Sequence, residues 1–135
     1  MKNKSVKILL LIAFVSLSFT VLVSCETGQI KGKYKLTAVD DSAKIETMEY
    51  FKSHTLTMNS KGGQNRYVWE YYTKKDGVHY KEEGDWAYEK KALVFYRTAK
   101  DPLTDKEEWN KKEKTITLTR YSDGNRIVVY TFQKQ

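Results

Sequence analysis

Apolar and polar residues alternate along most of the chain after residue 31, and a period of two is typical of half-buried β-strands. The segments 33–38, 55–58, 66–73 and 115–119 show this alternation, whereas 78–88, 92–97 and 127–132 read as strands by their apolar and aromatic content. Turn sequences separate them, such as Lys-Asp-Gly at 75–77 and Ser-Asp-Gly-Asn at 122–125, and these are typical of hairpins. The pattern therefore predicts seven or eight antiparallel strands that are joined mainly by hairpins.

A sheet of this size exposes two edge strands unless it closes on itself, because only closure removes the edges. Gly84 interrupts the strand pattern of 78–88, and a glycine in such a place predicts a bulge or a barrel corner. Residues 32–135 are therefore predicted to form an all-β, seven- or eight-stranded antiparallel barrel with one or two short helices. The interior of such a barrel is either packed solid or able to hold one small ligand.

The segment 42–52 does not follow the strand pattern. It places Ile45, Met48 and Phe51 at helical spacing, with residues 41–42 (Asp-Ser) as a cap. We therefore expect a short helix there.

The segment 99–112 is polar and contains Pro102, the only proline of the chain. Thr104 and Glu107 have the spacing of a capping box, which predicts a helical turn before Trp109. Connections of this length are uncommon in compact domains and often carry function.

Residues 1–24 have the parts of an export signal. Lys2, Lys4 and Lys7 form a basic start, and 8–23 is an apolar run. A helix that crosses a bilayer needs about 20 apolar residues, so this run is closer to the length of a cleaved signal. The pattern predicts a signal helix that is removed from the mature protein.

The sequence Leu-Val-Ser-Cys at 22–25 resembles the bacterial lipobox. That resemblance implies a diacylglycerol on the sulfur of Cys25, acyl chains that anchor the protein to a membrane, and cleavage before this residue. The chain then divides into a signal peptide (1–24), a lipidated cysteine with a short tether (25–31) and the barrel domain (32–135). An uncleaved anchor helix with an incidental cysteine is the alternative.

A second resemblance concerns the barrel. Residues 32–34 (Gly-Lys-Tyr) are similar to the Gly-x-Trp motif of the lipocalin-like families, with Tyr in place of Trp. Residues 84–88, followed by the apolar 93–95, resemble the mid-domain pattern of small bacterial lipocalin-like domains. The resemblance implies a lipocalin-like barrel.

In classical lipocalins a basic residue near the last strand packs across the aromatic ring of the opening motif. The resemblance therefore implies that Arg120 or Arg126 lies over Tyr34. Such a cation–π contact contributes about 0.5–2 kcal/mol to stability.

The charge balance argues against nucleic acid as a partner. The chain has a net charge of +7, and loss of the three signal lysines leaves +4 (7 − 3) on the mature part. The lysine pairs at 90–91 and 111–112 are interpreted as solvated turn residues rather than as a binding patch.

No motif indicates catalysis, a cofactor or a metal site. His54 and His79 are the only histidines, and we expect both to be partly exposed strand residues without metal-ligating neighbours. Three pairs of neighbouring acids occur, Asp40-Asp41, Glu82-Glu83 and Glu107-Glu108. Adjacent strand residues point to opposite faces, so no such pair forms a catalytic dyad by itself. The chain is not predicted to be an enzyme.

Aromatic residues are the best candidates for binding, since ten tyrosines and three tryptophans lie in the predicted mature part. Tyr67, Trp69 and Tyr71 share one strand face, and Trp86 and Tyr88 share a face of a nearby strand. If these faces surround a partly empty barrel, they form an amphipathic pocket. Otherwise they pack as core, or some of them lie outside as anchors for a protein partner.

Together these patterns predict a lipid-anchored envelope protein, most simply on the periplasmic face of an outer membrane. Its barrel binds a small apolar or amphipathic molecule without catalysis. The alternative is a protein-interaction or inhibitor module of the cell envelope with a solid barrel core.

Overall fold

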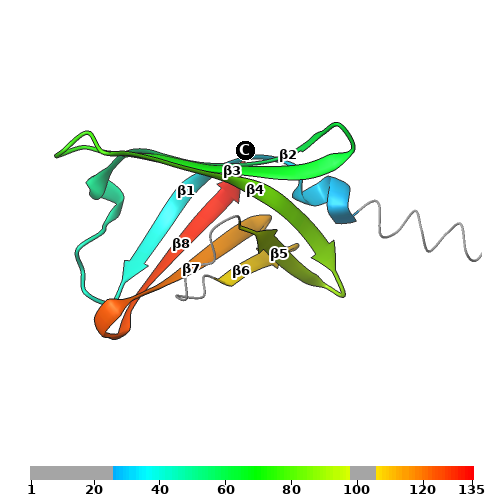
Figure 1. Cartoon of the computed structure of the whole chain (residues 1–135). Coiled ribbons are helices and arrows are strands. Elements are labelled where there is room, and N and C mark those ends of the chain that lie inside the picture. The colour runs from blue at the N-terminus through cyan, green and yellow to red at the C-terminus, as the bar shows by residue number, and fades with distance from the viewer. Residues whose placement is uncertain (1–25, 98–105) are drawn as a thin grey trace, which may run out of the picture. The chain divides into compact units, whose positions relative to one another are not determined.

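The computed structural model describes residues 26–97 and 106–135 (Figure 1). The chain divides into two compact units, Met1–Ile30 and Lys31–Gln135. In the first unit, residues 26–30 are helical. The described residues include no helix with the length and apolar character that crossing a bilayer requires.

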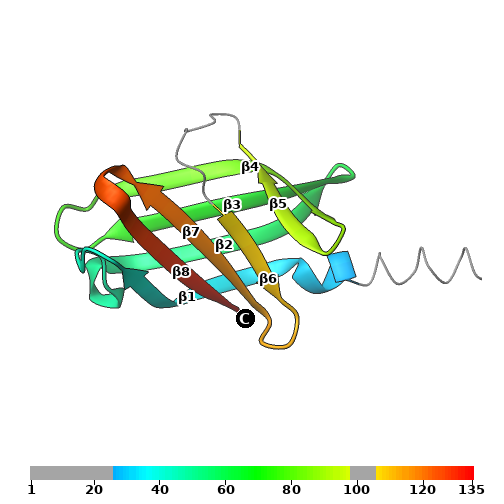
Figure 2. The same ribbon diagram turned by 90° about the horizontal axis from the view of Figure 1, so that it is seen from below.

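The second unit consists of eight antiparallel strands. They are β1 (Gly32–Asp41), β2 (Phe51–Lys61), β3 (Gln64–Thr73), β4 (His79–Glu89), β5 (Ala92–Tyr96), β6 (Lys106–Asn110), β7 (Thr115–Ser122) and β8 (Arg126–Lys134). Their order in the sheet is β5-β4-β3-β2-β1-β8-β7-β6. Because β1 pairs with β8, the sheet curls into a nearly closed barrel (Figures 1 and 2). The predicted all-β antiparallel barrel is confirmed, with eight strands.

One seam of the barrel has no hydrogen-bonded ladder. β5 pairs only with β4, and β6 pairs only with β7, so these two five-residue strands are the edges of the sheet. Figure 2 shows them side by side. The seam is therefore the place where side chains, rather than backbone hydrogen bonds, complete the barrel.

The predicted helix over 42–52 is wrong, because only Met48–Tyr50 (η1) form a 3₁₀ turn there and Phe51 begins β2. Ile45 and Met48 are exposed, so their spacing does not mark a buried helical face. Asp41 gives the physical reason. Its carboxylate accepts hydrogen bonds from the backbone N–H groups of Ala43, Ile45 and Glu46, and these bonds hold the segment as a loop.

The predicted helical turn before Trp109 is also wrong. Residues 106–110 form β6, in which Glu107 lies opposite Leu118 and Trp109 lies opposite Ile116. Pairing with β7 satisfies the backbone along this segment and overrides the local capping signal. Pro102 and Thr104 lie outside the described residues.

The core lies on the inner faces of the strands. Its fully buried members include Tyr34, Leu56, Tyr67, Trp69, Ile116, Leu118, Tyr130 and Phe132. Gly84 causes no shift in the β3–β4 register, so it is not a bulge. A Cβ atom at Gly84 would lie 2.7 Å from the ring of Tyr67, and the glycine therefore makes room for that ring.

Successive strands run up and down, so the connections alternate between two ends of the barrel. The Gly32 end, as we name it, contains Lys31, the turns at 62–63, 90–91 and 111–114, and the last residues of β8. The Tyr50 end contains the segment 42–50, the turn at 74–78 and the short helix η2 (Asp123–Asn125). Among the described residues of this unit, η1 and η2 are both short 3₁₀ turns.

Candidate functional site

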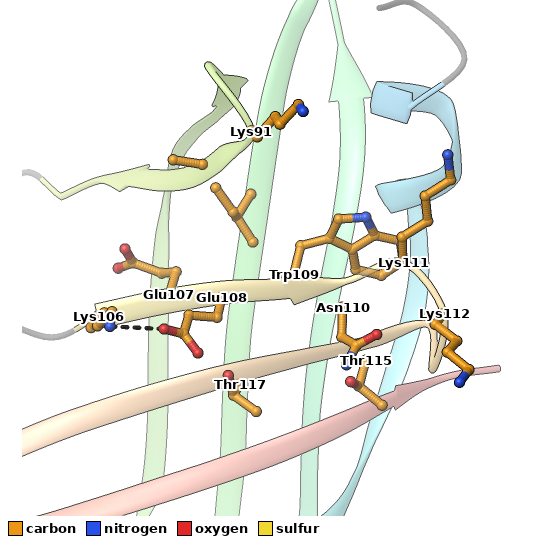
Figure 3. A pocket seen from close by; sticks show the side chains of 12 residues that line it. Lys91, Lys106, Glu107, Glu108, Trp109, Asn110, Lys111, Lys112, Thr115 and Thr117 are labelled. Carbon is orange, nitrogen blue, oxygen red and sulfur yellow. Dashed lines mark ion pairs between the residues drawn. The ribbon is translucent and has the colours of Figure 1, made fainter. Parts of the chain in front are cut away.

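A groove with a volume of about 730 Å³ lies along the seam between β5 and β6 (Figure 3). Its lining comes from Ala92 and Leu93 of β5, residues 106–110 of β6, Thr115 and Thr117 of β7, and the turn residues Lys91, Lys111 and Lys112. Eight of the twelve lie near the Gly32 end, namely residues 91–93 at the start of β5 and Trp109, Asn110, Lys111, Lys112 and Thr115 around the β6–β7 turn. The groove therefore opens toward that end of the barrel.

The groove has an apolar wall, and Trp109 in that wall has an N–H that no described residue accepts. Leu93 is buried, and the half-buried indole of Trp109 meets the ring of Tyr34 edge-on at a centroid distance of 6.4 Å. The Nε1–H of Trp109 is buried and has no hydrogen-bond acceptor among residues 26–97 and 106–135. Buried donors are normally satisfied, so this N–H is an exception among the described residues.

Positive charge surrounds the mouth of the groove. Lys91 comes from the β4–β5 turn, and Lys111 and Lys112 come from the β6–β7 turn (Figure 3). Lys106 pairs with Glu108 at 2.8 Å, and both side chains are more than half exposed. An exposed pair of this kind contributes little to stability but neutralises one lysine. Lys91 and Lys112, which form no ion pair with a described residue, thus keep the mouth positive.

A cluster of charges closes the other part of the seam, and we call it the Arg97 cluster (Glu82, Arg97 and Glu107). Arg97 follows β5, and its guanidinium lies 3.1 Å from Glu82 of β4 and 3.1 Å from Glu107 of β6. All three side chains are 20% exposed or less. The Tyr67 hydroxyl also donates to Glu82 at 3.2 Å. This cluster joins the two edge strands where the groove ends.

Sequence reasoning treated Glu82 as a member of an acid pair, treated Glu107 as a member of another pair and of a capping box, and did not identify Arg97. The useful signal was alternation within β6, where Lys106 and Glu108 are exposed while Glu107 and Trp109 are half-buried. That pattern indicates an inward-facing carboxylate, which needs a cation as partner.

The candidate binding aromatics do not line this groove. Tyr67, Trp69 and Trp86 are at most 3% exposed, and Tyr67 stacks on Phe95 at a centroid distance of 4.1 Å. The indole N–H of Trp86 donates to the backbone carbonyl of Arg66 at 3.1 Å. These three residues fill the barrel interior.

The other two candidates, Tyr71 and Tyr88, are half-buried. Tyr71 stacks on Tyr80 at 4.9 Å, toward the Tyr50 end. The structure therefore brings Tyr67, Trp69 and Tyr71 together on the inner face of β3, and it places the groove elsewhere.

The expected cation–π contact with Tyr34 is wrong. The Arg120 guanidinium lies 4.6 Å from the ring centroid of Trp69 and 5.4 Å from that of Tyr80. The register explains the difference, because Arg120 pairs with Val128 toward the Tyr50 end whereas Tyr34 pairs with Lys134 at the Gly32 end. Arg126, the second candidate, binds Asp41 instead.

His54 is buried, which corrects the expectation of partial exposure, whereas His79 is exposed and lies 2.7 Å from Glu70. Trp69 donates its indole N–H to Nε2 of His54 at 2.7 Å. The neutral ring must then carry its proton on Nδ1, which has no acceptor in the described chain. Burial, with a smaller contribution from Arg120, lowers the pKa of His54 to about 3.

The Tyr50 end contains a second buried charge group, which we call the Asp41 cluster (Asp41, Glu46, Arg126 and Tyr130). Arg126 donates to both carboxylate oxygens of Asp41, at 3.0 and 2.6 Å, and to Glu46 at 2.8 Å. The Tyr130 hydroxyl donates to Glu46 at 2.8 Å. Hydrogen bonding to Arg126 holds the pKa of Asp41 well below its ordinary value. The charged groups of this cluster are therefore paired with one another.

Among the described residues, no three or more His, Cys, Asp or Glu side chains are arranged to hold a metal ion. A scan of protein-family models gave no match to the chain. Searches of curated proteins and of solved structures gave no match either.

Proposed function

We propose that this chain is a lipid-anchored envelope protein that binds a small amphipathic molecule, without catalysis, in the groove between β5 and β6. The proposal rests on the seam between β5 and β6, which has no hydrogen-bonded ladder. The barrel is hydrogen-bonded everywhere except between two edge strands, and a groove of about 730 Å³ lies at that place. A volume in this range suits one small ligand.

The lining supports a ligand with two chemical parts. Leu93 and the Trp109 indole would contact an apolar body. The lysines at the mouth, Lys91, Lys111 and Lys112, would attract a negative group. An anionic amphiphile fits all of these features together.

The proposed anchor is Cys25, on the strength of its lipobox resemblance. Acyl chains on its sulfur would hold the protein at a membrane, which we propose to be the outer membrane on its periplasmic side. The barrel would then belong among the lipocalin-like domains, with its binding site moved from the interior to the seam.

Filling the groove with a large side chain tests whether it binds a small molecule. Full-length protein is purified from host membranes, and its co-purifying small molecules are identified by mass spectrometry. Ala92→Trp places a large side chain in the groove, whereas Ala43→Trp makes the same change at an exposed site of the Tyr50 end. We expect an amphiphile with the wild type and with Ala43→Trp, and its loss with Ala92→Trp. The same molecules in all three samples, or none in any, would contradict the proposal.

The anchor is tested separately by Cys25→Ser. We expect this variant to remain an unprocessed precursor and to take up no radiolabelled fatty acid, because the acceptor sulfur is gone. Normal processing and labelling of Cys25→Ser would rule out the lipid anchor.

A protein-interaction module is the second candidate, and one observation favours it. Large apolar side chains are exposed toward the Tyr50 end, among them Ile45, Met48, Val78 and Ile127. Exposed apolar residues that gather in one region are typical of protein contacts. A photo-crosslinking amino acid at Val78 should then capture an envelope protein, whereas the same residue at Gly63, at the other end, should not.

A further inference from the structure

The Gly32 end of the barrel is strongly basic. Its lysines are Lys31, Lys33, Lys61, Lys90, Lys91, Lys111, Lys112, Lys114 and Lys134. Its acids are only Glu89 and Glu113, so its side chains have a net charge of +7 (9 − 2). At the Tyr50 end, by contrast, the residues 40–52, 72–79 and 122–127 contain five basic and six acidic side chains. This difference in charge between the two ends is not visible in the linear sequence, because the lysines come from five separate places in it.

The topology turns these separate lysines into one surface. The start of β1, the turns at 62–63, 90–91 and 111–114 and the end of β8 all lie at the same end of an up-and-down barrel. Most of the nine side chains are exposed, and Lys31 and Lys134 are half-buried. The following lysines form no ion pair with any described residue: Lys31, Lys33, Lys90, Lys91, Lys112 and Lys114. Their charge therefore faces outward.

Three lysines of this end have a strained backbone, whereas Lys44 is the only lysine that does so at the Tyr50 end. Lys90, Lys91 and Lys114 have φ angles of 50°, 62° and 54°, in the left-handed region that glycine and asparagine adopt more easily. Two-residue hairpins with this geometry favour Asn-Gly, so Lys-Lys is a costly choice for the turn at 90–91. Strained residues persist mostly where function requires them.

The Gly32 end also lacks the exposed apolar side chains found elsewhere. The exposed large apolar residues of the described chain are Ile45, Met48, Tyr72, Val78, Tyr96 and Ile127. All of them lie in the Tyr50 end or in the strand halves that lead to it. A charged surface without apolar anchors suits the phosphate headgroups of a bilayer better than a protein interface, because interface centres are depleted of lysine.

We propose that the Gly32 end of the barrel rests on an anionic bilayer surface, with its lysines among the lipid headgroups. This inference rests on the proposed lipid anchor, which would attach to the barrel through Lys31 at the same end. The mouth of the groove, with Lys91, Lys111 and Lys112, then faces the headgroup layer. An anionic amphiphile passes between bilayer and groove without crossing water.

Lysine footprinting on full-length protein tests the orientation. The protein is reconstituted in vesicles of phosphatidylcholine alone or of phosphatidylcholine with phosphatidylglycerol, and lysine acetylation is followed residue by residue by mass spectrometry. We expect the modification rates of the nine lysines to fall several-fold in the anionic vesicles and to recover at high salt, because salt screens headgroup attraction. Lys44, Lys52, Lys74 and Lys75 at the Tyr50 end are the internal control and should keep their rates.

Charge reversal provides the matched variants. The triple variant Lys61→Glu, Lys91→Glu and Lys112→Glu changes one residue in each hairpin turn of the Gly32 end. The control triple, Lys44→Glu, Lys74→Glu and Lys75→Glu, makes the same change of charge at the Tyr50 end. We expect the first to abolish protection of the remaining Gly32-end lysines, about tenfold or more, since each lysine near an anionic surface contributes severalfold to binding. The control should leave that protection intact.

Three results would overturn the inference. Equal rates in both kinds of vesicle would show that the lysines do not meet the headgroups, and protection spread over both ends would show attraction without orientation. Protection by soluble heparin but not by anionic vesicles would assign the lysines to a polyanionic macromolecule instead. The footprint is also recorded for Ala92→Trp, because protection that persists there separates membrane contact from ligand binding in the groove.

Discussion

At the Tyr50 end of the barrel one cluster of charges, the Asp41 cluster, is buried and internally paired, whereas the Gly32 end has no such cluster among the described residues and most of its charged side chains face solvent. Asp41, which is fully buried, binds Arg126 and three backbone N–H groups. The Gly32 end instead contains the strained lysine turns and the mouth of the seam groove. The difference teaches that charge stabilises the fold at one end and remains available for binding at the other. Mutations at the two ends should therefore separate stability from function.

The largest expected effect on stability is at Asp41. Asp41→Ala leaves the Arg126 guanidinium without its closest carboxylate and three backbone N–H groups without an acceptor. We expect the free energy of unfolding to fall by about 3–5 kcal/mol in chemical denaturation, as for other buried pairs that lose one partner. Glu113→Ala, an exposed site of the Gly32 end, is the control and should change it by less than about 0.5 kcal/mol. Equal losses of unfolding free energy in the two variants would contradict the claim that charge stabilises the fold at one end only.

Acid should act on the Tyr50 end through His54. Its folded pKa of about 3 lies below the ordinary value of 6.5, so the unfolded chain takes up a proton first as the pH falls. Stability is therefore complete above pH 6.5 and decreases by about 1.4 kcal/mol per pH unit below it. Between pH 6.5 and 4.5 this amounts to about 2–3 kcal/mol.

His54→Gln should flatten that pH dependence, because the amide does not titrate but still accepts the Trp69 N–H. Ser53→Gln, at an exposed site of the same strand, is the control and should leave the slope unchanged, because it removes no titrating group. Denaturation curves at several pH values measure both. An unchanged slope in His54→Gln would mean that another group causes the acid sensitivity.

The Arg97 cluster should have an intermediate effect, because it holds the seam but is partly solvated. Glu107→Gln removes one of the two carboxylates near Arg97, and we expect a loss of about 1.5–3 kcal/mol. Hydrogen exchange should accelerate in β5 and β6 and stay constant in β1 and β8. Glu108→Gln, which breaks only the exposed pair with Lys106, should cost at most about 1 kcal/mol.

The smallest effect is a gain in stability. Replacing the turn by Lys90→Asn and Lys91→Gly relieves two left-handed lysines, and we expect a gain of about 0.5–1 kcal/mol together with weaker contact to anionic vesicles. Lys44→Gly relieves the same strain at the Tyr50 end, where φ is 56°. Lys44→Gly should raise the free energy of unfolding without changing contact with anionic vesicles. If both changes alter contact with anionic vesicles to the same extent, strain at the Gly32 end has no special link to membrane contact.

Alternation and turn sequences predicted the barrel well, because each strand reveals its inward face over a few neighbouring residues. They failed at Ile45 and Met48, whose helical spacing occurs on an exposed loop that Asp41 organises. They failed again at β6, because its strand character depends on pairing with β7 rather than on its own sequence.

The candidate site was less predictable, since its parts come together only through topology. Arg97 meets Glu82, 15 residues earlier, and Asp41 meets Arg126, 85 residues later. Nothing local indicates either pairing. The lysines at 90–91 and 111–112 were correctly placed in turns, but only the up-and-down order of strands shows that they share one end with the groove.

The position of β1 has a mechanical consequence. This first strand is not at an edge of the sheet, because it is hydrogen-bonded to β2 on one side and to β8 on the other. A pull on the chain at Lys31 is therefore resisted by two ladders at once, and one of these ties the start of the barrel to its last strand. The weakly held edges, β5 and β6, lie at the opposite extremes of the sheet and bear none of this load directly. The barrel is thus built to withstand traction where the chain enters it, and its seam carries none of that traction.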